Sequence, residues 1–398
     1  MKDSFLLGSI KKNKFEYVPD PIFNQYITFA KKHPDVLILR QVIEKMMILD
    51  FIIPLINKYF KGGKILEVGC GLGIHSSLLT NFGDVSATEL QNTVQWLGEN
   101  IDKNRKFVFD ELASQPIDFR YNNGLTLPYP DKSFDFVFHN SVIEHVPDIY
   151  AFNKEIRRVL KQNGICICIT GTPILCRFRF FKNYVLRFPF IFAYGILSVV
   201  LNNLSSHIYF IRKLIAGINI WHFHSTTERL QHILDNQYYG YDEQSHLPPK
   251  TIRSLYPKLR HFVREPEYNR IVIEQIAVCN KVSVHSLLLQ LVKHFKSPWN
   301  DIIFRITPST HGQHTQNAST EVREWRINTW SESFTKTSYA IQDIVGYRYQ
   351  HVFDVTYNEN INCWILYHSL PLIRKMARFY PAAFASEIII VARNIGNS

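Results

Sequence analysis

Two acidic residues and a run of glycines are spaced as a nucleotide-binding site requires. The stretch Glu67–Gly73 reads E-V-G-C-G-L-G, and Glu89 follows about twenty residues after the first of these glycines. Glycines let the backbone take positive φ and let a ligand approach the main chain, and a helix beginning near Ile74 would point its free N–H groups at the same place. A carboxylate at Glu89 could accept hydrogen bonds from both hydroxyls of a ribose. The pattern predicts a cradle for a cofactor that contains a nucleoside.

The flanking residues predict that these groups lie at one edge of a parallel sheet. Ile65, Leu66 and Val68 form the apolar run of a buried strand, and Asp84–Thr88 predicts the next strand, with Glu89 at its end. Short strands then alternate with helical stretches, which is the pattern of βαβ units. The helices expected in this region are Ile74–Asn81, Gln91–Ile101 and Pro147–Leu160. The expected fold class is therefore α/β, with a mostly parallel sheet flanked by helices.

The glycine pattern disfavours a dinucleotide site without excluding one, because G-x-G-x-x-G requires glycine where Ile74 or Ser76 stands. Two further motifs follow instead. The loop Asn123–Tyr129 reads N-G-L-T-L-P-Y and leads into a strand, after which His139–Val146 reads H-N-S-V-I-E-H-V. A helix with a glycine stop at Gly164 then leads to a last strand of this region.

Together with E-x-G-x-G-x-G, these ordered motifs resemble the Rossmann-like class I S-adenosylmethionine (SAM) dependent methyltransferases, of the methyltransferase domain 11 type. The resemblance implies a Rossmann-like fold, SAM as the cofactor and methyl transfer as the reaction. The cofactor-binding residues that it implies are Glu67 at the methionine amine, Gly69, Cys70, Gly71 and Gly73 under the adenosyl group, Glu89 and Leu90 at the ribose, Asn123, Gly124 and Leu125 at the adenine, and His139, Asn140 and Ser141 on the methionine side. Asn123 replaces the aspartate that is usual in the family, and its amide oxygen can still accept from the adenine amino group.

The reaction needs aligned partners and, for a hydroxyl acceptor, one base. His145 is the first candidate because it follows the methionine-side segment. His222 and His224 come next, then His311, because they lie on expected substrate-side loops. Glu144 and His145 alone cannot close a metal site, so no metal is predicted.

Composition together with the family resemblance divides the chain into four expected parts. Residues 1–60 form an irregular leader, rich in proline up to residue 35, followed by a lid helix over Val36–Phe60; residues 61–173 form the SAM-binding core; residues 174–220 form a basic and apolar insertion; and residues 221–398 hold the substrate-side helices and remaining strands. In the insertion, Phe188–Leu201 is almost uninterruptedly apolar but shorter than the ~20 residues of a spanning helix. With its basic flanks it either meets anionic lipid at a membrane interface or caps the pocket.

The final strands of the sheet have two possible locations. Val263 with Ile271–Cys279 could supply them, in which case the tail is partly duplicated. Alternatively, residues 174–320 are a large insertion, and the strands are Ala340–Val345 and Glu387–Val391, preceded by a helix over Glu321–Phe334. Both alternatives stay open, and either gives a helical insertion and a C-terminal α+β extension.

The composition of the chain limits which kinds of binding partner are expected. The formal charge of +11 and the pI of about 9.2 suggest an anionic partner or a solvated basic surface. No compact basic domain with aromatic platforms is delimited, so nucleic acid is not expected as the partner. The six cysteines lack metal or disulfide spacing and suit a reducing compartment. With only Phe5–Leu7 as an apolar core near the N-terminus, no signal peptide is expected. We therefore expect a cytoplasmic protein, which is peripheral at the inner membrane face if the insertion meets lipid.

Three functional hypotheses follow. The first is O-methylation of a saccharide or of a lipid-linked glycan acceptor. The second is O- or N-methylation of a small quinone-like or aromatic molecule. The third is a non-catalytic SAM-fold protein that binds a partner.

Overall fold

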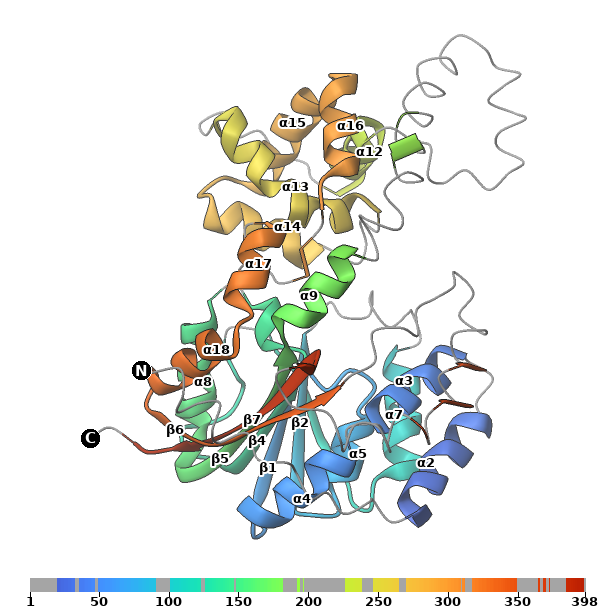
Figure 1. Ribbon diagram of the computed structural model, residues 1–398, viewed down its shortest axis with the longest axis vertical. Helices are drawn as coiled ribbons and strands as arrows, with labels where there is room; N and C mark the ends of the chain where they lie inside the picture. Colours follow the sequence, from blue (N-terminus) through green and yellow to red (C-terminus); the bar gives the residue numbers. More distant parts are fainter. Residues whose placement is uncertain are drawn as a thin grey trace. The chain divides into compact units, whose positions relative to one another are not determined.

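The computed structural model shows two compact units (Figure 1). The structure describes residues 20–32, 36–46, 49–90, 101–122, 126–146, 148–181, 192–193, 196, 226–237, 246–264, 270–308, 310–311, 317–348, 364–365, 368–369, 372 and 384–396. Unit 1 comprises Met1–Cys176 and Val322–Ser398, and unit 2 comprises Arg177–Glu321. The chain thus leaves unit 1 to build unit 2 and then returns to complete unit 1.

Unit 1 is built on a seven-stranded sheet with the order β3-β2-β1-β4-β5-β7-β6. The strands are β1 (Lys64–Val68), β2 (Asp84–Leu90), β3 (Asp118–Asn122), β4 (Phe134–Asn140), β5 (Leu160–Gly171), β6 (Tyr339–Arg348) and β7 (Glu387–Asn394). Strands β1 to β5 pair in parallel, and β7 runs antiparallel to both of its neighbours. The α/β fold class with a mostly parallel sheet is confirmed. The strand order reverses beside β1, and this is where open α/β sheets bind ligands.

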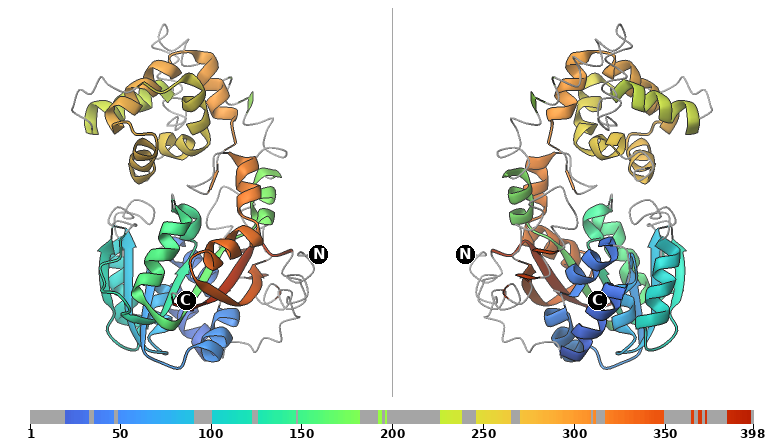
Figure 2. Two further views of the ribbon diagram at one scale, coloured as in Figure 1. Left: turned by 90° about the vertical axis from the view of Figure 1, so that its left-hand side faces the viewer. Right: turned by 90° about the vertical axis from the view of Figure 1, so that its right-hand side faces the viewer.

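Helices cover both faces of this sheet (Figure 2). On one face, α2 (Asp20–Lys32), α3 (Val36–Met46), α4 (Leu49–Tyr59), α5 (Ile74–Leu79) and α7 (Ile101–Leu112) share an apolar core with the strands. On the other face lie η1 (Ile143–His145), α8 (Ile149–Val159) and α18 (Ile327–Thr335), with the last residues of α17 (Ala318–Glu324). Helix α8 buries Ile149, Phe152, Ile156 and Val159, the three-to-four-residue spacing of a helix stripe. Asp148 caps this helix by accepting from two backbone N–H groups.

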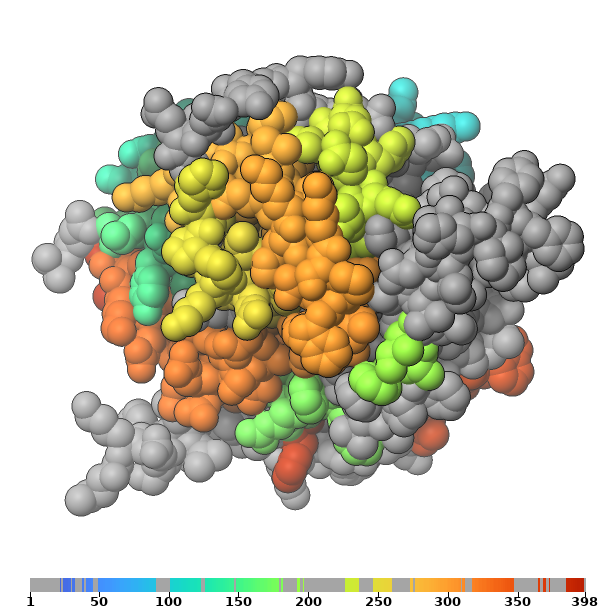
Figure 3. All heavy atoms as spheres, turned by 90° about the horizontal axis from the view of Figure 1, so that it is seen from above, coloured from blue at the N-terminus to red at the C-terminus, as the bar shows by residue number. Residues whose placement is uncertain are grey.

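Unit 2 is helical and has its own apolar core. Its described helices are α12 (Thr226–Gln237), α13 (Pro249–Arg264), α14 (Arg270–Cys279), α15 (Val284–Phe295) and α16 (Pro298–Ile306), and α9 (Pro173–Phe180) crosses the boundary between the units. Tyr256 of α13 packs edge-on against Phe304 of α16. In Figure 3 the yellow part of unit 2 lies beside its orange part. No helix among the described residues is long and apolar enough to cross a membrane. Most of Phe188–Leu201 lies outside those residues.

The structure decides between the two locations for the final strands. Residues 271–279 belong to α14, so their expected assignment as a strand is wrong, as is that of Val263, which lies in α13. The β-branched run suggested a strand, but Ile273, Ile276 and Ala277 are buried at helical spacing. The later pair forms β6 and β7, as the alternative with a large insertion expected.

Several expected helix limits are also corrected. Residues 20–32 are helical rather than irregular, since Pro21 stands in the first turn, where proline is tolerated. The single helix expected over residues 36–60 is two helices, α3 and α4. The helix expected over residues 321–334 is likewise divided, between α17 and α18. Helix α8 ends at Val159 and β5 begins at once, so Gly164 is inside a strand and is not a helix stop. Of the expected helix 91–101, residues 91–100 lie outside the described residues, and α7 begins at its last residue.

Two tryptophans join the C-terminal part of unit 1 to β5. The indole N–H of Trp330 donates to the Gly171 carbonyl oxygen at 3.0 Å. A Cβ added at Gly171 would lie 2.2 Å from the ring of Trp325. Both indoles are fully buried, so the returning segment is fixed by close packing and by a hydrogen bond.

We expect Trp330→Phe to lower the free energy of unfolding by about 2 kcal/mol, since the buried Gly171 carbonyl loses its indole donor. Urea unfolding followed by circular dichroism measures this change. Trp299→Phe is the matched control, because Trp299 is 67% exposed. Equal losses in the two variants would contradict the role assigned to the bond.

Candidate functional site

The glycine turn between β1 and α5 is a tight loop whose shape depends on glycine. Gly69, Gly71 and Gly73 have φ values of 74°, 57° and 77°, all in the left-handed region. A Cβ added at Gly69 would lie 2.5 Å from Val142, and one added at Gly73 would lie 2.1 Å from Phe109. The turn therefore has no space for larger side chains at these two positions.

The same turn is tied to the neighbouring strand. The backbone N–H groups of Gly69 and Cys70 donate to the Thr88 carbonyl oxygen at 2.9 and 3.0 Å. Burial raises the pKa of the Cys70 thiol well above its ordinary value, so this side chain stays neutral. Cys70 therefore takes part in the turn through its backbone and through the packing of its side chain, and it adds no charge.

Glu89 stands beside the turn, near the carboxyl end of β2. Its Oε2 accepts from the Gly71 N–H at 2.6 Å, and its Oε1 accepts from the Leu90 N–H at 2.9 Å. Burial raises its pKa, while these two N–H groups and the Arg105 guanidinium act in the opposite direction. Each carboxylate oxygen has one protein donor here, so lone pairs remain for two further donors.

Glu67 is buried at the end of β1 and faces α5. Ser76 donates its hydroxyl to Oε2 of Glu67, and Nδ1 of His75 lies 3.5 Å from Oε1. Burial lowers the pKa of His75, and the Glu67 carboxylate opposes this shift. Two residues at the start of α5 thus orient the Glu67 carboxylate.

The segment after β4 reaches the same edge of the sheet mainly through its backbone. Ser141 has φ 56°, and its N–H donates to the Ile169 carbonyl oxygen at 3.0 Å. The Ser141 hydroxyl lies 3.2 Å from the Asn140 side-chain oxygen. The structure thus places Asn140 and Ser141 at the carboxyl ends of β4 and β5, on the edge where the glycine turn lies.

The side chain of His139 points elsewhere. It is fully buried and meets the Phe152 ring edge-on, with centroids 5.2 Å apart. Neither ring nitrogen has a hydrogen-bond partner in the part of the chain that the structure describes, and burial lowers its pKa to about 3. The imidazole is therefore neutral and packs toward α8, which leaves only the His139 backbone at the sheet edge.

The two candidate bases that the structure describes belong to different units. His145 ends η1 in unit 1 and is half-buried, whereas His311 belongs to unit 2. His222 and His224 lie outside the described residues, as do Asn123, Gly124 and Leu125. The structure therefore brings together Glu67, the glycine turn, Glu89, Leu90, Asn140 and Ser141 at one edge of the sheet, and His145 follows them within a few residues along the chain.

Glu144, beside His145, is a buried acid with an unusual environment. Its Oε2 accepts from the Thr170 hydroxyl at 3.3 Å. Burial raises its pKa to about 8, with the Glu387 carboxylate adding to the rise and Thr170 and Lys45 reducing it. At neutral pH the carboxyl group is therefore mostly protonated.

This shift predicts a dependence of stability on pH. A raised pKa means that the folded state binds a proton that the unfolded state releases above about pH 4.5, so stability falls as the pH rises toward about 8. Glu144→Gln should remove this fall, and the difference in unfolding free energy between variant and wild type should change by roughly 4 kcal/mol from acidic to mildly basic pH. Urea titrations across this range measure the difference. Glu155→Gln is the control, because Arg158 lowers the pKa of Glu155 and the group stays ionised over this pH range. The difference in unfolding free energy between this variant and wild type should therefore not change with pH. If the difference for Glu144→Gln does not change with pH either, the raised pKa assigned to Glu144 is wrong.

The sequence predictions missed Arg105 and Phe109, both on α7. Arg105 donates from Nε to the Gly71 carbonyl oxygen at 2.6 Å, and Phe109 is the ring that closes on Gly73. A signal existed in the sequence: Ile101, Arg105 and Val108 are buried at helical spacing, which places a charged residue in an apolar stripe. A helix was expected to end at residue 101, so the helical spacing of these later residues was not recognised.

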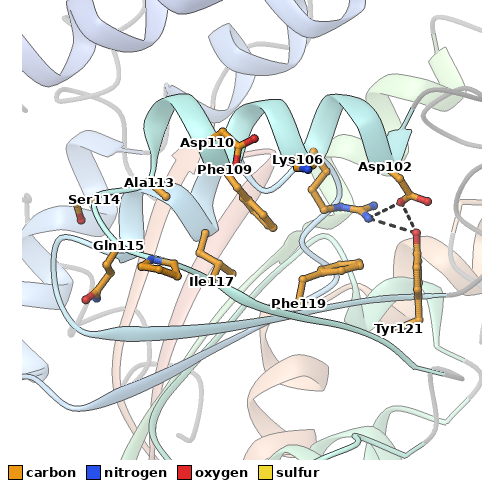
Figure 4. Close-up of a pocket in the computed structure, with 12 residues that line it drawn as sticks. Asp102, Lys106, Phe109, Asp110, Ala113, Ser114, Gln115, Ile117, Phe119 and Tyr121 are labelled. Atoms are coloured by element: carbon orange, nitrogen blue, oxygen red, sulfur yellow. Dashed lines mark hydrogen bonds and ion pairs between the residues drawn. The ribbon is translucent and has the colours of Figure 1, made fainter.

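A cavity of about 630 Å³ lies beside Arg105, between α7 and the edge strand β3 (Figure 4). Phe109, Phe119 and Tyr121 line it from the two elements. In Figure 4 the Asp102 carboxylate faces the Tyr121 hydroxyl, and the dashed lines join both groups to the Arg105 guanidinium. The cavity is thus next to the glycine turn, from which Arg105 and Phe109 separate it.

The residues at the sheet edge fit SAM on the evidence of their own geometry. The turn has three left-handed glycines, and a buried carboxylate with spare lone pairs lies beside it. A second buried carboxylate, Glu67, is held by α5 where the resemblance expects the methionine amine. Nucleoside hydroxyls and an amine are the donors that such carboxylates accept.

Known proteins resemble this part of the chain. A family model described as "Methyltransferase domain" matches residues 66–168. A sterol 24-C-methyltransferase from Aspergillus fumigatus is 31% identical over 105 residues, which cover 26% of this chain and 27% of that protein. A demethylmenaquinone methyltransferase from Geobacillus sp. is 29% identical over 133 residues, covering 32% of this chain and 54% of that protein. The chain thus spans between about a quarter and about half of the length of these relatives.

A solved structure of an S-adenosylmethionine dependent methyltransferase from Mesorhizobium loti aligns with 85% of this chain and 96% of that chain, with 11% identity and a TM-score of 0.36. The family match covers residues 66–168, and these residues hold most of the parallel strands of the sheet. A domain of this type indicates SAM as its cofactor. Residues 66–168 are thus a methyltransferase domain of the SAM-dependent, Rossmann-like class I family.

Proposed function

We propose that this protein transfers a methyl group from SAM to a small-molecule acceptor. The observation that carries the proposal is the Glu89 carboxylate, buried beside a turn of three left-handed glycines and bonded to the Gly71 N–H at 2.6 Å. Ribose hydroxyls and an adenosyl group are what this combination suits. The match of residues 66–168 to methyltransferase domains supports the same reading.

The chain's own residues would bind and orient the reactants. Glu89 accepts from the ribose hydroxyls, Glu67 accepts from the methionine amine, and the backbone at Asn140 and Ser141 borders the methionine end. When bound, SAM supplies an activated methyl group on a sulfonium, so alignment provides most of the rate increase. For a hydroxyl acceptor, His145 would take the proton that the acceptor oxygen loses on methylation.

The acceptor that we propose first is a saccharide or lipid-linked glycan, methylated on oxygen at a membrane surface. The positive formal charge of +11 supports an acceptor or surface with anionic groups. A quinone-like or aromatic acceptor is the second candidate, favoured by the relatives named for sterol and demethylmenaquinone methylation. A partner-binding protein without activity is the third reading.

Incubation of the purified protein with methyl-tritiated SAM tests the proposal. Separate acceptor pools should contain lipid-linked glycans, free saccharides and quinols, each with and without anionic vesicles. Label in a glycan pool supports the first candidate, and label in the quinol pool supports the second. No label in any pool, with SAM binding intact, supports the partner-binding reading. Glu89→Gln is the negative control, and His145→Ala reports on the base.

A further inference from the structure

The glycine turn is held from outside the SAM site by one helix. From α7, Arg105 donates its Nε–H to the Gly71 carbonyl oxygen at 2.6 Å, and the Phe109 ring packs on Gly73. Gly71 therefore has its carbonyl oxygen held by Arg105 and its N–H held by Glu89. The backbone of Gly71, through the two peptide planes on either side of its Cα, links the two charged groups.

Arg105 itself is fixed by its surroundings. Its guanidinium carbon lies over the Phe119 ring, 4.3 Å from the ring centre, within the range of a cation–π contact. Its Nη1 donates to Asp102 at 2.8 Å and lies 3.4 Å from the Tyr121 hydroxyl. The side chain is only 3% exposed. Such a planar, pre-ordered fork loses little freedom when it holds the turn.

We propose that Arg105 is a positioning residue for SAM binding, which holds the backbone of Gly71 so that Glu89 faces the ribose. The inference rests on the proposed function, because it concerns the same cofactor site. Arg105 acts through Gly71 and Glu89 and needs no contact with SAM.

Electrostatics supports the geometry. Burial raises the pKa of Glu89, the nearby Glu67 carboxylate raises it further, and the Arg105 cation lowers it. The other titratable group near both is the Cys70 thiol, which stays neutral. Loss of Arg105 should therefore shift the acidic limit of SAM binding to higher pH, because Glu89 must be ionised to accept both hydroxyls.

The cavity beside α7 makes a chemical-rescue experiment possible. Arg105 lines this space of about 630 Å³, and its Nη2 has no hydrogen-bond partner among the residues that the structure describes. In Arg105→Ala, a methylguanidinium ion could enter from the cavity and stack on Phe119 in place of the lost group. Methylammonium carries the charge without the planar fork and should not substitute for it.

The test is SAM titration calorimetry on wild type, Arg105→Ala, Arg105→Lys and the control Lys106→Ala. Lys106 is the next residue on α7, lines the same cavity, and is exposed. We expect Arg105→Ala to weaken SAM binding about 10-fold, the usual effect of losing one charge-assisted hydrogen bond. Methylguanidinium, far below denaturing concentration, should restore part of the affinity, and the acidic limit of binding should lie at higher pH than in wild type. Lys106→Ala should bind as wild type does.

Distinct results would overturn distinct claims. If wild type binds SAM and Arg105→Ala binds it equally well at every pH, the inference about Arg105 is wrong and the proposed function stands. If wild type does not bind SAM, the proposed function is wrong and the inference falls with it. If Arg105→Ala does not fold, Arg105→Lys decides, since it keeps the charge and loses the fork: weaker SAM binding supports the inference, and unchanged affinity overturns it.

Discussion

Replacing Glu89 with glutamine should weaken SAM binding about 100-fold, because a buried carboxylate that we propose to accept from two ribose hydroxyls becomes a neutral amide with one acceptor. The amide NH₂ would also face either the Gly71 N–H or the Leu90 N–H, and two donors that face each other cannot form a hydrogen bond. The effect should appear in the dissociation constant for SAM and equally in that for its demethylated product, since both carry the ribose. Titration calorimetry measures both constants.

Asp84→Asn is the matched control for this change. Asp84 begins the same strand at its opposite end and is exposed, so its replacement alters the charge of β2 without touching the site. Its SAM affinity should equal that of wild type. Equal affinities for Glu89→Gln and wild type would remove Glu89 from the cofactor site.

Gly73→Ala should lower the free energy of unfolding by about 4 kcal/mol, the sum of left-handed strain and a severe clash. Its φ is 77°, and the new Cβ would lie 2.1 Å from Phe109. The turn cannot relieve this clash without moving Phe109 on α7 or the start of α5. SAM binding should be lost together with stability. Urea unfolding and SAM titration on the same sample measure the two effects.

Two further variants separate strain from clash. Gly62→Ala has a positive φ of 107° with no atom within 4 Å of the new Cβ, so it should cost only about 1 kcal/mol of strain. Phe109→Ala combined with Gly73→Ala should be less destabilised than the two single changes predict together, since the clash disappears. Strict additivity in this cycle would show that Phe109 does not close on Gly73.

The sequence allowed the parallel part of the sheet to be predicted because its strands are short, apolar and followed by distinct turn residues. Ile65–Val68 and the glycines after it specify both a buried strand and the turn that ends it. By contrast, residues 271–279 contain the same β-branched residues and form a helix. Their partners are other helices of unit 2, and that tertiary context is absent from a local pattern.

The candidate site was predictable where the backbone makes it and was missed where a distant side chain supports it. The glycine turn and Glu89 are local in sequence and were expected from the motif. Arg105 reaches Gly71 across thirty-four positions, and no motif spacing indicates such a contact. For His139 the motif was misleading. Its position in the motif predicted a contact with the cofactor, but its side chain faces Phe152 in the core.

The central claim is that the edge of the sheet at Gly69–Gly73 and Glu89 binds SAM. Its most direct test is titration calorimetry of the wild-type protein with SAM, with the demethylated product and with NAD. We expect saturable binding of SAM and of the product at one site per chain, and no binding of NAD, since Ile74 stands where a dinucleotide site requires glycine. Binding of NAD without SAM, or binding of neither compound, would contradict the claim.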